Sequence, residues 1–136
     1  MKIFRNLVLS RVEGCEIYAY DHTIHAPPTR GRSIKYFKTG LGKGGTELKT
    51  LTELIHQNNH LDHVIDYLKV DVEGAEWGTG GLSDWMESKV LDNVNQLALE
   101  LHTNPESDFI RLVGILQQLY RLGFRLISQG RRYHIL

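Results

Sequence analysis

The sequence predicts an α/β fold whose sheet is mostly parallel. Along its 136 residues, short runs of strand-forming residues alternate with segments whose apolar residues have helical spacing, and this alternation is typical of βαβ units. Glycines or helix-capping residues separate many of these segments. The sequence contains no internal repeat, low-complexity tract or domain boundary. We therefore expect residues 1–136 to form a single domain, which at this length buries roughly 68% of its unfolded surface.

The first half of the chain is expected to hold two helices and two strands. In order, these are a helix over 3–12, a strand over 16–20, a loop over 22–32, a strand over 34–39, a glycine-rich loop over 40–45 and a helix over 50–58. Pro27 and Pro28 place the first loop. The second helix has the clearest start, because Thr50 and Glu53 occupy the two positions of a capping box.

The second half is expected to hold four strands and two helices. In order, these are a strand over 64–70, a helix over 83–89, a strand over 94–101, a helix over 108–122, a strand over 124–128 and a last strand over 133–136 that pairs with it antiparallel. Ser83 is the expected cap of the first helix. Asp108 is expected to cap the second helix and Gly123 to stop it. One face of that helix is apolar, made of Phe109, Leu112, Val113, Leu116, Leu119 and Tyr120.

Composition and charge exclude several classes of function. Sixteen basic residues balance sixteen acidic ones, so no charge footprint indicates binding to nucleic acid or to an anionic membrane. The single cysteine, Cys15, excludes an internal disulfide and a cysteine-based zinc cluster. The chain has no signal-peptide pattern and no apolar run near the ~18 residues of a transmembrane helix. The compartment is therefore unassigned, with the cytoplasm as the default.

The stretch over 66–77 is the strongest candidate for a functional site. A predicted strand stops on Asp71, and Glu73, Gly74 and Glu76 follow at once. Because isolated ionised groups are expensive to bury, Asp71 should end the strand at a cleft. Ligands of open α/β sheets bind outside the carboxyl ends of the strands. The stretch therefore predicts an active-site edge, while Glu76 and Trp77 are expected to begin the next element.

A second group of polar residues ends the strand predicted next to it. Glu100 and His102 share one face of that strand, and with Asp71 and Glu73 they would place carboxylates and an imidazole at one rim. Asp71, Glu100 and His102 could bind a divalent cation there. The same rim could instead hold a general base beside an acceptor hydroxyl. The alternative without a function is a set of caps and salt bridges.

Weaker signals come from the glycine-rich loop and from Asp21. Gly40, Gly42 and Gly45 match the spacing of a dinucleotide loop, but residues 46–49 separate them from the helix start. This displaces the helix dipole from the phosphate site and favours a flexible turn or a partial cofactor contact. Asp21 follows a strand, where a carboxylate can hold ribose hydroxyls or can cap its own loop. Both interpretations of Asp21 stay open.

Three histidines have the spacing of one helix face. His56, His60 and His63 lie at i, i+4 and i+7, which resembles a metal site. The intervening residues 58–62 favour a break in the helix, and no carboxylate is fixed nearby. We therefore favour a solvated helix end over a metal site.

The stretch over 67–77, YLKVDVEGAEW, resembles the hallmark of the FkbM-type methyltransferases, closest to their animal methyltransferase-like branch. Weaker motifs follow the family's order: YAYD over 18–21, YFKTGLG over 36–42, LALELH over 97–102 and LYRLGFRL over 119–126. The resemblance covers nearly the whole chain. It implies a Rossmann-like class I methyltransferase sheet with flanking helices and an antiparallel C-terminal strand.

The resemblance also implies a cofactor and a division of roles. S-adenosylmethionine would be the methyl donor, and an oxygen of a small molecule or sugar the acceptor. Asp21 would hold the ribose of the cofactor. The loop of Gly40, Leu41 and Gly42 would lie near its adenine. Asp71, Glu73 and His102 would face the transferred methyl group and the acceptor.

The chain departs from the family before Cys15. The family's first strand and glycine-rich loop belong there, and residues 11–14, RVEG, do not match that loop. The resemblance therefore implies a partial domain that lacks this strand and loop. One alternative is a catalytically inactive relative that survives as a binding or interaction domain and self-associates through an exposed sheet edge. Another is a nicotinamide-dinucleotide protein that uses the glycine-rich loop.

Overall fold

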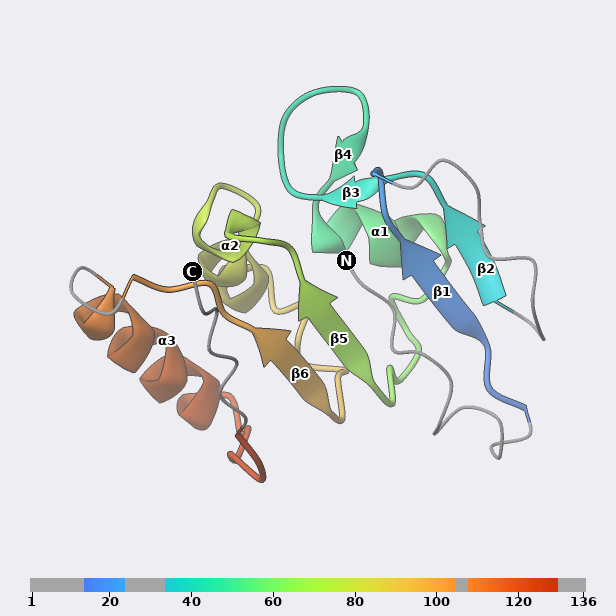
Figure 1. Ribbon diagram of the computed structural model, residues 1–136. Coiled ribbons are helices and arrows are strands. Elements are labelled where there is room, and N and C mark those ends of the chain that lie inside the picture. The colour runs from blue at the N-terminus through green and yellow to red at the C-terminus, as the bar shows by residue number, and fades with distance from the viewer. Residues whose placement is uncertain (1–13, 24–33, 105–107, 130–136) are drawn as a thin grey trace. The chain divides into compact units, whose positions relative to one another are not determined.

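The computed structural model describes residues 14–23, 34–104 and 108–129 (Figure 1). The chain divides into two compact units, Met1–Thr103 and Asn104–Leu136. The predicted helix over 3–12 and the predicted last strand over 133–136 lie outside the described residues, as does most of the loop over 22–32. The first strand and glycine-rich loop of the family were expected to be missing from the residues before Cys15. Of these residues, the structure describes only Gly14.

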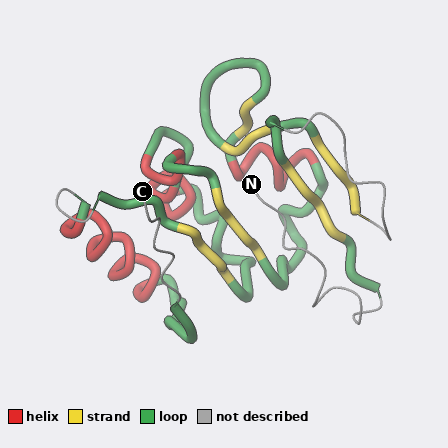
Figure 2. Tube along the Cα trace, viewed as in Figure 1, coloured by secondary structure: helices red, strands yellow, loops and turns green. Residues whose placement is uncertain are grey.

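The described strands of the first unit, drawn in yellow in Figure 2, form three parallel pairs. The pairs are β1 (Ile17–Tyr20) with β2 (Ile34–Phe37), β3 (Gly40–Leu41) with β4 (Leu48–Lys49), and β5 (Leu68–Asp71) with β6 (Leu97–Glu100). The α/β class and the parallel pairing predicted from the sequence are confirmed. Among the described residues, however, no hydrogen-bonded ladder joins the pairs into one continuous sheet.

Aromatic side chains hold the β1–β2 pair together. The Tyr20 and Phe37 rings stack with centroids 4.8 Å apart, and these two residues face each other in the register of the pair. The Tyr20 hydroxyl accepts a hydrogen bond from the Asn58 side chain, at the end of the following helix. The carboxyl end of β1 is therefore fixed to that helix.

The helix α1 (Leu51–Gln57) begins as the sequence predicts. The Glu53 amide donates to Thr50 Oγ1 at 3.2 Å, and the Thr50 amide donates to Glu53 Oε2 at 2.7 Å. This reciprocal pair satisfies amides that have no partner inside the helix. The helix ends at Asn58, and Asn59 has a left-handed φ of 58°. The predicted break before His60 is therefore confirmed.

The strand β5 is shorter than the run over 64–70 that was expected, and it extends to Asp71. Ile65 forms only an isolated bridge with Val94, while Tyr67 is half exposed. A short 3-10 turn, η1 (Ala75–Trp77), follows the strand. The predicted strand over 94–101 is likewise reduced to β6, whose register places Glu100 opposite Asp71.

The helix α2 (Leu82–Glu87) has Gly81 at its N-cap position, and Ser83 lies inside its first turn, which corrects the prediction. Close packing requires glycine at this cap position, because a Cβ at Gly81 would lie 2.4 Å from the backbone oxygen of Glu76. Asp84 instead accepts a hydrogen bond from the Gly80 amide. The core of the first unit comprises Ala19, Tyr20, Leu41, Leu51, Leu54, Ile55, Val70, Leu82, Trp85, Leu91 and Val94.

The second unit contains α3 (Phe109–Arg121), the clearest helix predicted. Gly123 follows its end with φ of 101°, as expected of a stop. Asp108 stands at the cap position, but its side chain accepts from the Asn104 amide rather than from the helix. Within the predicted apolar face, Leu119 is buried whereas Phe109 is 66% exposed, and the other buried residue of the helix, Ile115, was not assigned to that face.

The predicted strand over 124–128 is wrong, because the structure assigns no strand to residues 124–129. Local contacts hold this segment to the end of α3 instead. The Phe124 amide donates to the Leu119 carbonyl at 3.0 Å. The Arg125 guanidinium donates to the Tyr120 carbonyl at 2.9 Å and lies over the Tyr120 ring. Within the described ranges, no helix is long and apolar enough to cross a membrane.

Candidate active site

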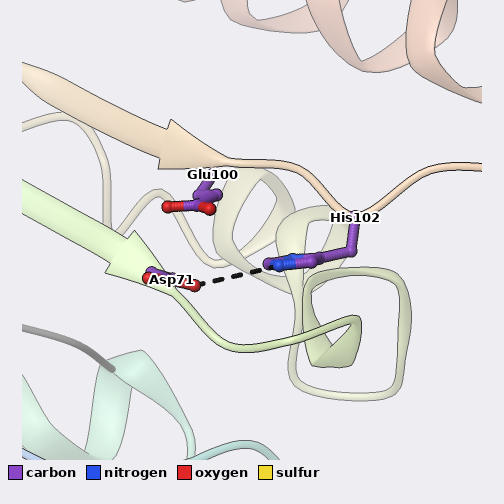
Figure 3. Close-up of side chains that lie close together, drawn as sticks. All are labelled: Asp71, Glu100 and His102. Atoms are coloured by element: carbon purple, nitrogen blue, oxygen red, sulfur yellow. Dashed lines mark ion pairs between the residues drawn. The ribbon is translucent and has the colours of Figure 1, made fainter. Parts of the chain in front are cut away.

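The carboxyl ends of β5 and β6 bring the predicted polar residues together (Figure 3). Asp71 is the last residue of β5 and pairs in register with Glu100, and His102 follows two residues later. Because the pair is parallel, both strands end at the same edge. One ligand atom each from Asp71, Glu100 and His102 lie within 4.8 Å of one another. The sequence therefore predicted this meeting of residues correctly.

Asp71 is buried with an incomplete set of partners. Its side chain is 2% exposed, and its Oδ2 lies 3.5 Å from the Lys69 ammonium. The other oxygen, Oδ1, lies 4.0 Å from His102 Nε2 and has no hydrogen-bond partner among the described residues. A buried carboxylate oxygen without such a partner costs free energy. The arrangement therefore favours a cation beside Oδ1.

Glu76 orients the His102 ring. Its side chain is 1% exposed, and its Oε1 lies 3.1 Å from His102 Nδ1. The same oxygen accepts from the His102 amide, and Oε2 accepts from the Gly74 amide at 2.8 Å. A carboxylate beside Nδ1 favours the tautomer with its proton on that nitrogen. Nε2 is then the ring atom that faces Asp71.

Glu73 also reaches the ring. Its Oε2 lies 3.3 Å from His102 Nε2, and its side chain is 63% exposed. Glu73 has a left-handed φ of 51°, followed by Gly74 with φ of 100°. A residue other than glycine rarely adopts this backbone region, and such residues gather at functional sites. The turn after β5 is therefore shaped so that Glu73 lies beside His102.

Two residues that tie this turn to β6 were missed by sequence reasoning. Glu76 was expected only to begin the next element, and Trp77 likewise. Trp77 Nε1 donates to the His102 carbonyl at 2.7 Å, so both residues hold the chain around His102. Their partner lies 25 or 26 residues away, and no local pattern reveals so distant a contact. The available signal was a second acid close behind Glu73.

Asp21, predicted to hold a ribose, caps its own loop. Its Oδ1 accepts from the Thr23 amide at 2.8 Å and from the Thr23 hydroxyl at 2.7 Å. Partial burial raises the pKa of Asp21, but these hydrogen bonds outweigh it, so the pKa lies below its ordinary value. The loop-cap interpretation is confirmed, and the ribose role stays a prediction. Both hydrogen bonds use Oδ1, so a ligand contact at Oδ2 is compatible with this cap.

The glycine-rich segment is not entirely a loop. Gly40 and Leu41 form β3, and the Gly40 amide donates to the Glu47 carbonyl at 2.8 Å. A Cβ at Gly40 would lie 2.3 Å from His22 Nδ1. The strand β4 stands between these glycines and α1, whose first amides the Thr50–Glu53 capping box serves. This arrangement differs from a dinucleotide loop, in which the helix N-terminus meets the phosphates.

A cavity of about 670 Å³ joins the two groups of predicted residues. Its lining includes the expected cofactor-binding residues together with Asp71 and Glu73, while Glu100 and His102 are outside the lining. The full lining is Asp21, His22, Thr23, Gly40, Leu41, Gly42, Lys43, Leu48, Asp71, Val72, Glu73, Ala75, Gly78 and Thr79. Its volume is in the range of small-molecule and cofactor sites.

The three histidines of 56–63 do not form a comparable group. His60 and His63 rings are 5.7 Å apart, and the His60 ring packs edge-on against Tyr18. Burial lowers the pKa of His60 below its ordinary value. Among the described residues, the metal-ligand geometry is met only by the group at Asp71.

Comparison with known proteins indicates the family of the chain. Residues 4–121 match a protein-family model described as a methyltransferase domain. The chain belongs to this methyltransferase family. A probable methyltransferase-like protein 24 of Rattus norvegicus is 25% identical in a match 134 positions long that covers 83% of this chain and 36% of that protein. The chain thus spans about a third of the length of this curated relative. No solved structure matches.

Proposed function

We propose that the chain is an S-adenosylmethionine-dependent methyltransferase of the FkbM type. The acceptor is an oxygen of a small molecule or sugar. The observation that carries the proposal is the shared cavity: residues after β1 and at β3 line it together with Asp71 and Glu73. The methyltransferase family match supports it, and the FkbM-like stretch over 67–77 supplies the subtype.

We also propose that the β1–β2 and β5–β6 pairs belong to one Rossmann-like sheet. Both pairs are parallel. Asp21 directly follows β1 and Asp71 ends β5, and both line the same cavity. Ligands of open α/β sheets bind at this edge. The proposal therefore accounts for the position of the cavity at the carboxyl ends of strands from both pairs.

The lining fits two parts of the cofactor. Asp21 offers a carboxylate for ribose hydroxyls, which such a group can accept as a pair of hydrogen bonds. Gly40 and Gly42 line the same cavity with backbone alone, which leaves room for the adenine of the cofactor. At the other end, the carboxylates of Asp71 and Glu73 border the space, where a cationic sulfonium is electrostatically favoured. When bound, the cofactor supplies an already activated methyl group.

The protein's own part in the reaction is alignment and proton removal. The Asp71–His102 pair is the proposed proton acceptor for the hydroxyl of the acceptor. Glu76 fixes the proton of His102 on Nδ1, which leaves Nε2 as the basic atom. The oxygen of the acceptor gains the methyl group as the C–S bond breaks, and its proton passes to this pair.

Titration calorimetry with S-adenosylmethionine tests the proposal. We compare the wild-type chain with Asp21→Asn, which keeps an acceptor for Thr23 but replaces one carboxylate oxygen with a donor. We expect roughly tenfold weaker binding, the loss of about one charge-assisted hydrogen bond. The matched control is Glu16→Gln, an exposed carboxylate paired with Lys35 outside the cavity. Equal affinity of Asp21→Asn and wild type would remove Asp21 from the role.

A second candidate is an inactive methyltransferase-like interaction domain. It is favoured by the strand pairs, because β1 and β5 each have one edge that pairs with no other described strand. Such edges promote association. Sedimentation of the purified chain at several concentrations, together with transfer of a labelled methyl group to candidate sugars, separates the two. Self-association without cofactor binding supports the interaction domain, whereas turnover excludes it.

A further inference from the structure

Three side chains of different types converge where β5 and β6 end (Figure 3). Asp71, Glu100 and His102 each place one ligand atom within 4.8 Å of the others. We propose that these three residues bind one divalent transition-metal cation, with Zn²⁺ and Mn²⁺ as the ions that fit their chemistry. The site is distinct from the proposed cofactor contacts, because Glu100 and His102 do not line the cavity.

Asp71 supplies the first argument for a cation. It is 2% exposed, and its Oδ1 has no hydrogen-bond partner among the described residues. The neighbouring Lys69 ammonium approaches the other oxygen, Oδ2, at 3.5 Å. Oδ1 is directed toward His102 (Figure 3). A buried anionic oxygen in this state is stabilised when it coordinates a metal.

His102 supplies the second argument. Glu76 Oε1 lies 3.1 Å from Nδ1, which is the carboxylate–histidine contact that commonly orients metal-bound imidazoles. On the other side of the ring, Nε2 faces Asp71 Oδ1 at 4.0 Å and Glu73 Oε2 at 3.3 Å. A lone pair on Nε2 would repel both carboxylates. A cation between Nε2 and Oδ1 converts this repulsion into coordination.

The distances are compatible with a site that closes on binding. Ligands about 2.1 Å from a tetrahedral ion lie about 3.4 Å apart, so the pairs here have to approach by about 1 Å. Side-chain rotation of His102 and Glu100, both partly exposed, can supply this movement. Three protein ligands leave at least one position open, as in catalytic rather than structural metal sites.

The ligand set decides which ions fit. Ca²⁺ and Mg²⁺ prefer oxygen ligands alone, whereas the imidazole of His102 suits first-row transition metals. Zn²⁺ should bind more tightly than Mn²⁺, in agreement with the general affinity order of these ions. Mg²⁺ should bind the most weakly of the three.

A cation here would deepen the proposed methyl transfer, and this consequence rests on that function. The open position would bind the acceptor hydroxyl and lower its pKa. The hydroxyl proton would leave to solvent, the oxygen would attack the methyl carbon, and the C–S bond would break to release a neutral thioether. Asp71 and His102 would then act as metal ligands and no longer as the proton acceptor.

Calorimetry with zinc chloride on chain stripped with a chelator tests the site without cofactor or acceptor. We expect one tightly bound ion per chain. Asp71→Asn and His102→Ala should each weaken binding by about 100-fold or more, and Glu76→Gln by about 10-fold to 100-fold. The controls are Asp66→Asn, an exposed carboxylate bonded to Asn95, and His63→Gln, which tests the other histidine group. Neither should change the affinity.

A measurement on the wild-type chain keeps the proposal falsifiable if a variant misfolds. Substoichiometric Mn²⁺ should broaden the NMR signals of residues 71, 100 and 102 before those of residues 60 and 63. Broadening confined to 60 and 63, zinc affinity weaker than about 1 mM, or unchanged zinc affinity of both ligand variants overturns the site. Any of these results leaves the proposed methyl transfer intact, because that reaction also has a metal-free proton acceptor.

Discussion

Asp21 and Asp71 line the same cavity, each at the carboxyl end of a parallel strand, but their surroundings differ. Asp21 lies after β1, and the Thr23 amide and hydroxyl both donate to its Oδ1. Asp71 ends β5, is 2% exposed, and has one oxygen without a hydrogen-bond partner in the part of the chain that the structure describes. A locally satisfied acid costs little to keep, whereas a buried, unsatisfied one has to be supported by other contacts. The half of the site at the carboxyl ends of β5 and β6 is therefore the demanding half, the one that costs free energy to maintain.

The largest effect expected at the demanding half is that of Glu76→Ala. This change removes the acceptor of the Gly74 amide, in the turn after β5, and of the His102 amide, which follows β6. We expect a loss of about 3 kcal/mol in the free energy of unfolding, because two partly buried donors lose their partner. Urea unfolding measures it. Glu76→Gln, which keeps an acceptor, should cost less than half as much. Equal losses would mean that the turn requires the charge and both acceptor oxygens of the Glu76 carboxylate, because Gln keeps the volume and one acceptor.

Alanine substitutions at Gly81 and Gly40 compare the β5–β6 half of the site with the half that contains Asp21. A Cβ at Gly81 would lie 2.4 Å from the Glu76 backbone oxygen, whereas at Gly40 the obstructing atoms belong to the His22 and Leu48 side chains. Backbone cannot move aside as a side chain can. We expect Gly81→Ala to cost about 2 kcal/mol and Gly40→Ala less than about 1 kcal/mol. Thermal unfolding of both variants checks the order, and the reverse order would contradict the comparison.

In the metal-free chain, Asp71→Asn should stabilise the fold, whereas the substitutions above destabilise it. Because a neutral amide is cheaper to bury than an unsatisfied carboxylate, we expect the free energy of unfolding to rise by about 1 kcal/mol. With zinc at about 100 times its dissociation constant, the wild-type chain should gain about 2.7 kcal/mol, and the variant should gain almost none. Unfolding with and without zinc measures both changes. A strongly destabilised metal-free variant would show that the Lys69 contact outweighs the burial cost.

The smallest expected effect is the pH dependence at Asp21. Hydrogen bonds from Thr23 hold the pKa of Asp21 below its ordinary value despite partial burial. A carboxyl with a lowered folded-state pKa contributes stability above its unfolded pKa of about 3.8–3.9 and loses it as the pH falls through the folded value. The stability difference between wild type and Asp21→Ala should therefore shrink below about pH 4. Unfolding curves from pH 2 to 7 would refute this if the difference stayed constant.

Elements whose cause is local could be predicted from the sequence. The capping box of Thr50 and Glu53 and the break before His60 depend on neighbours within a few residues, and both are confirmed. The meeting of Asp71 with His102 was also predictable, because parallel strands end at one edge.

What the sequence did not reveal depends on distant or competing contacts. Glu76 has its partner 26 residues away, so its role could not be read from its neighbours. The segment after Gly123 has the composition of a strand, yet Arg125 bonds back to the Tyr120 carbonyl. A strand is stabilised by its neighbours in a sheet, and propensity alone does not decide it. The cap of α2 is Gly81 and not Ser83, and the close approach of Gly81 to the Glu76 backbone is a contact that the local sequence does not reveal.

The register of β5 and β6 has one more consequence. Asp71 stands directly opposite Glu100 at the last rung of the ladder, one rung beyond Val70 and Leu99. Two like charges across a rung oppose pairing, so the ladder should fray from this end. Amide hydrogen exchange would then be faster at Asp71 than at Val70, and any ion that neutralises the two carboxylates would slow it. Cation binding at the site and closure of the last β5–β6 residue pair are thus coupled, so that each favours the other.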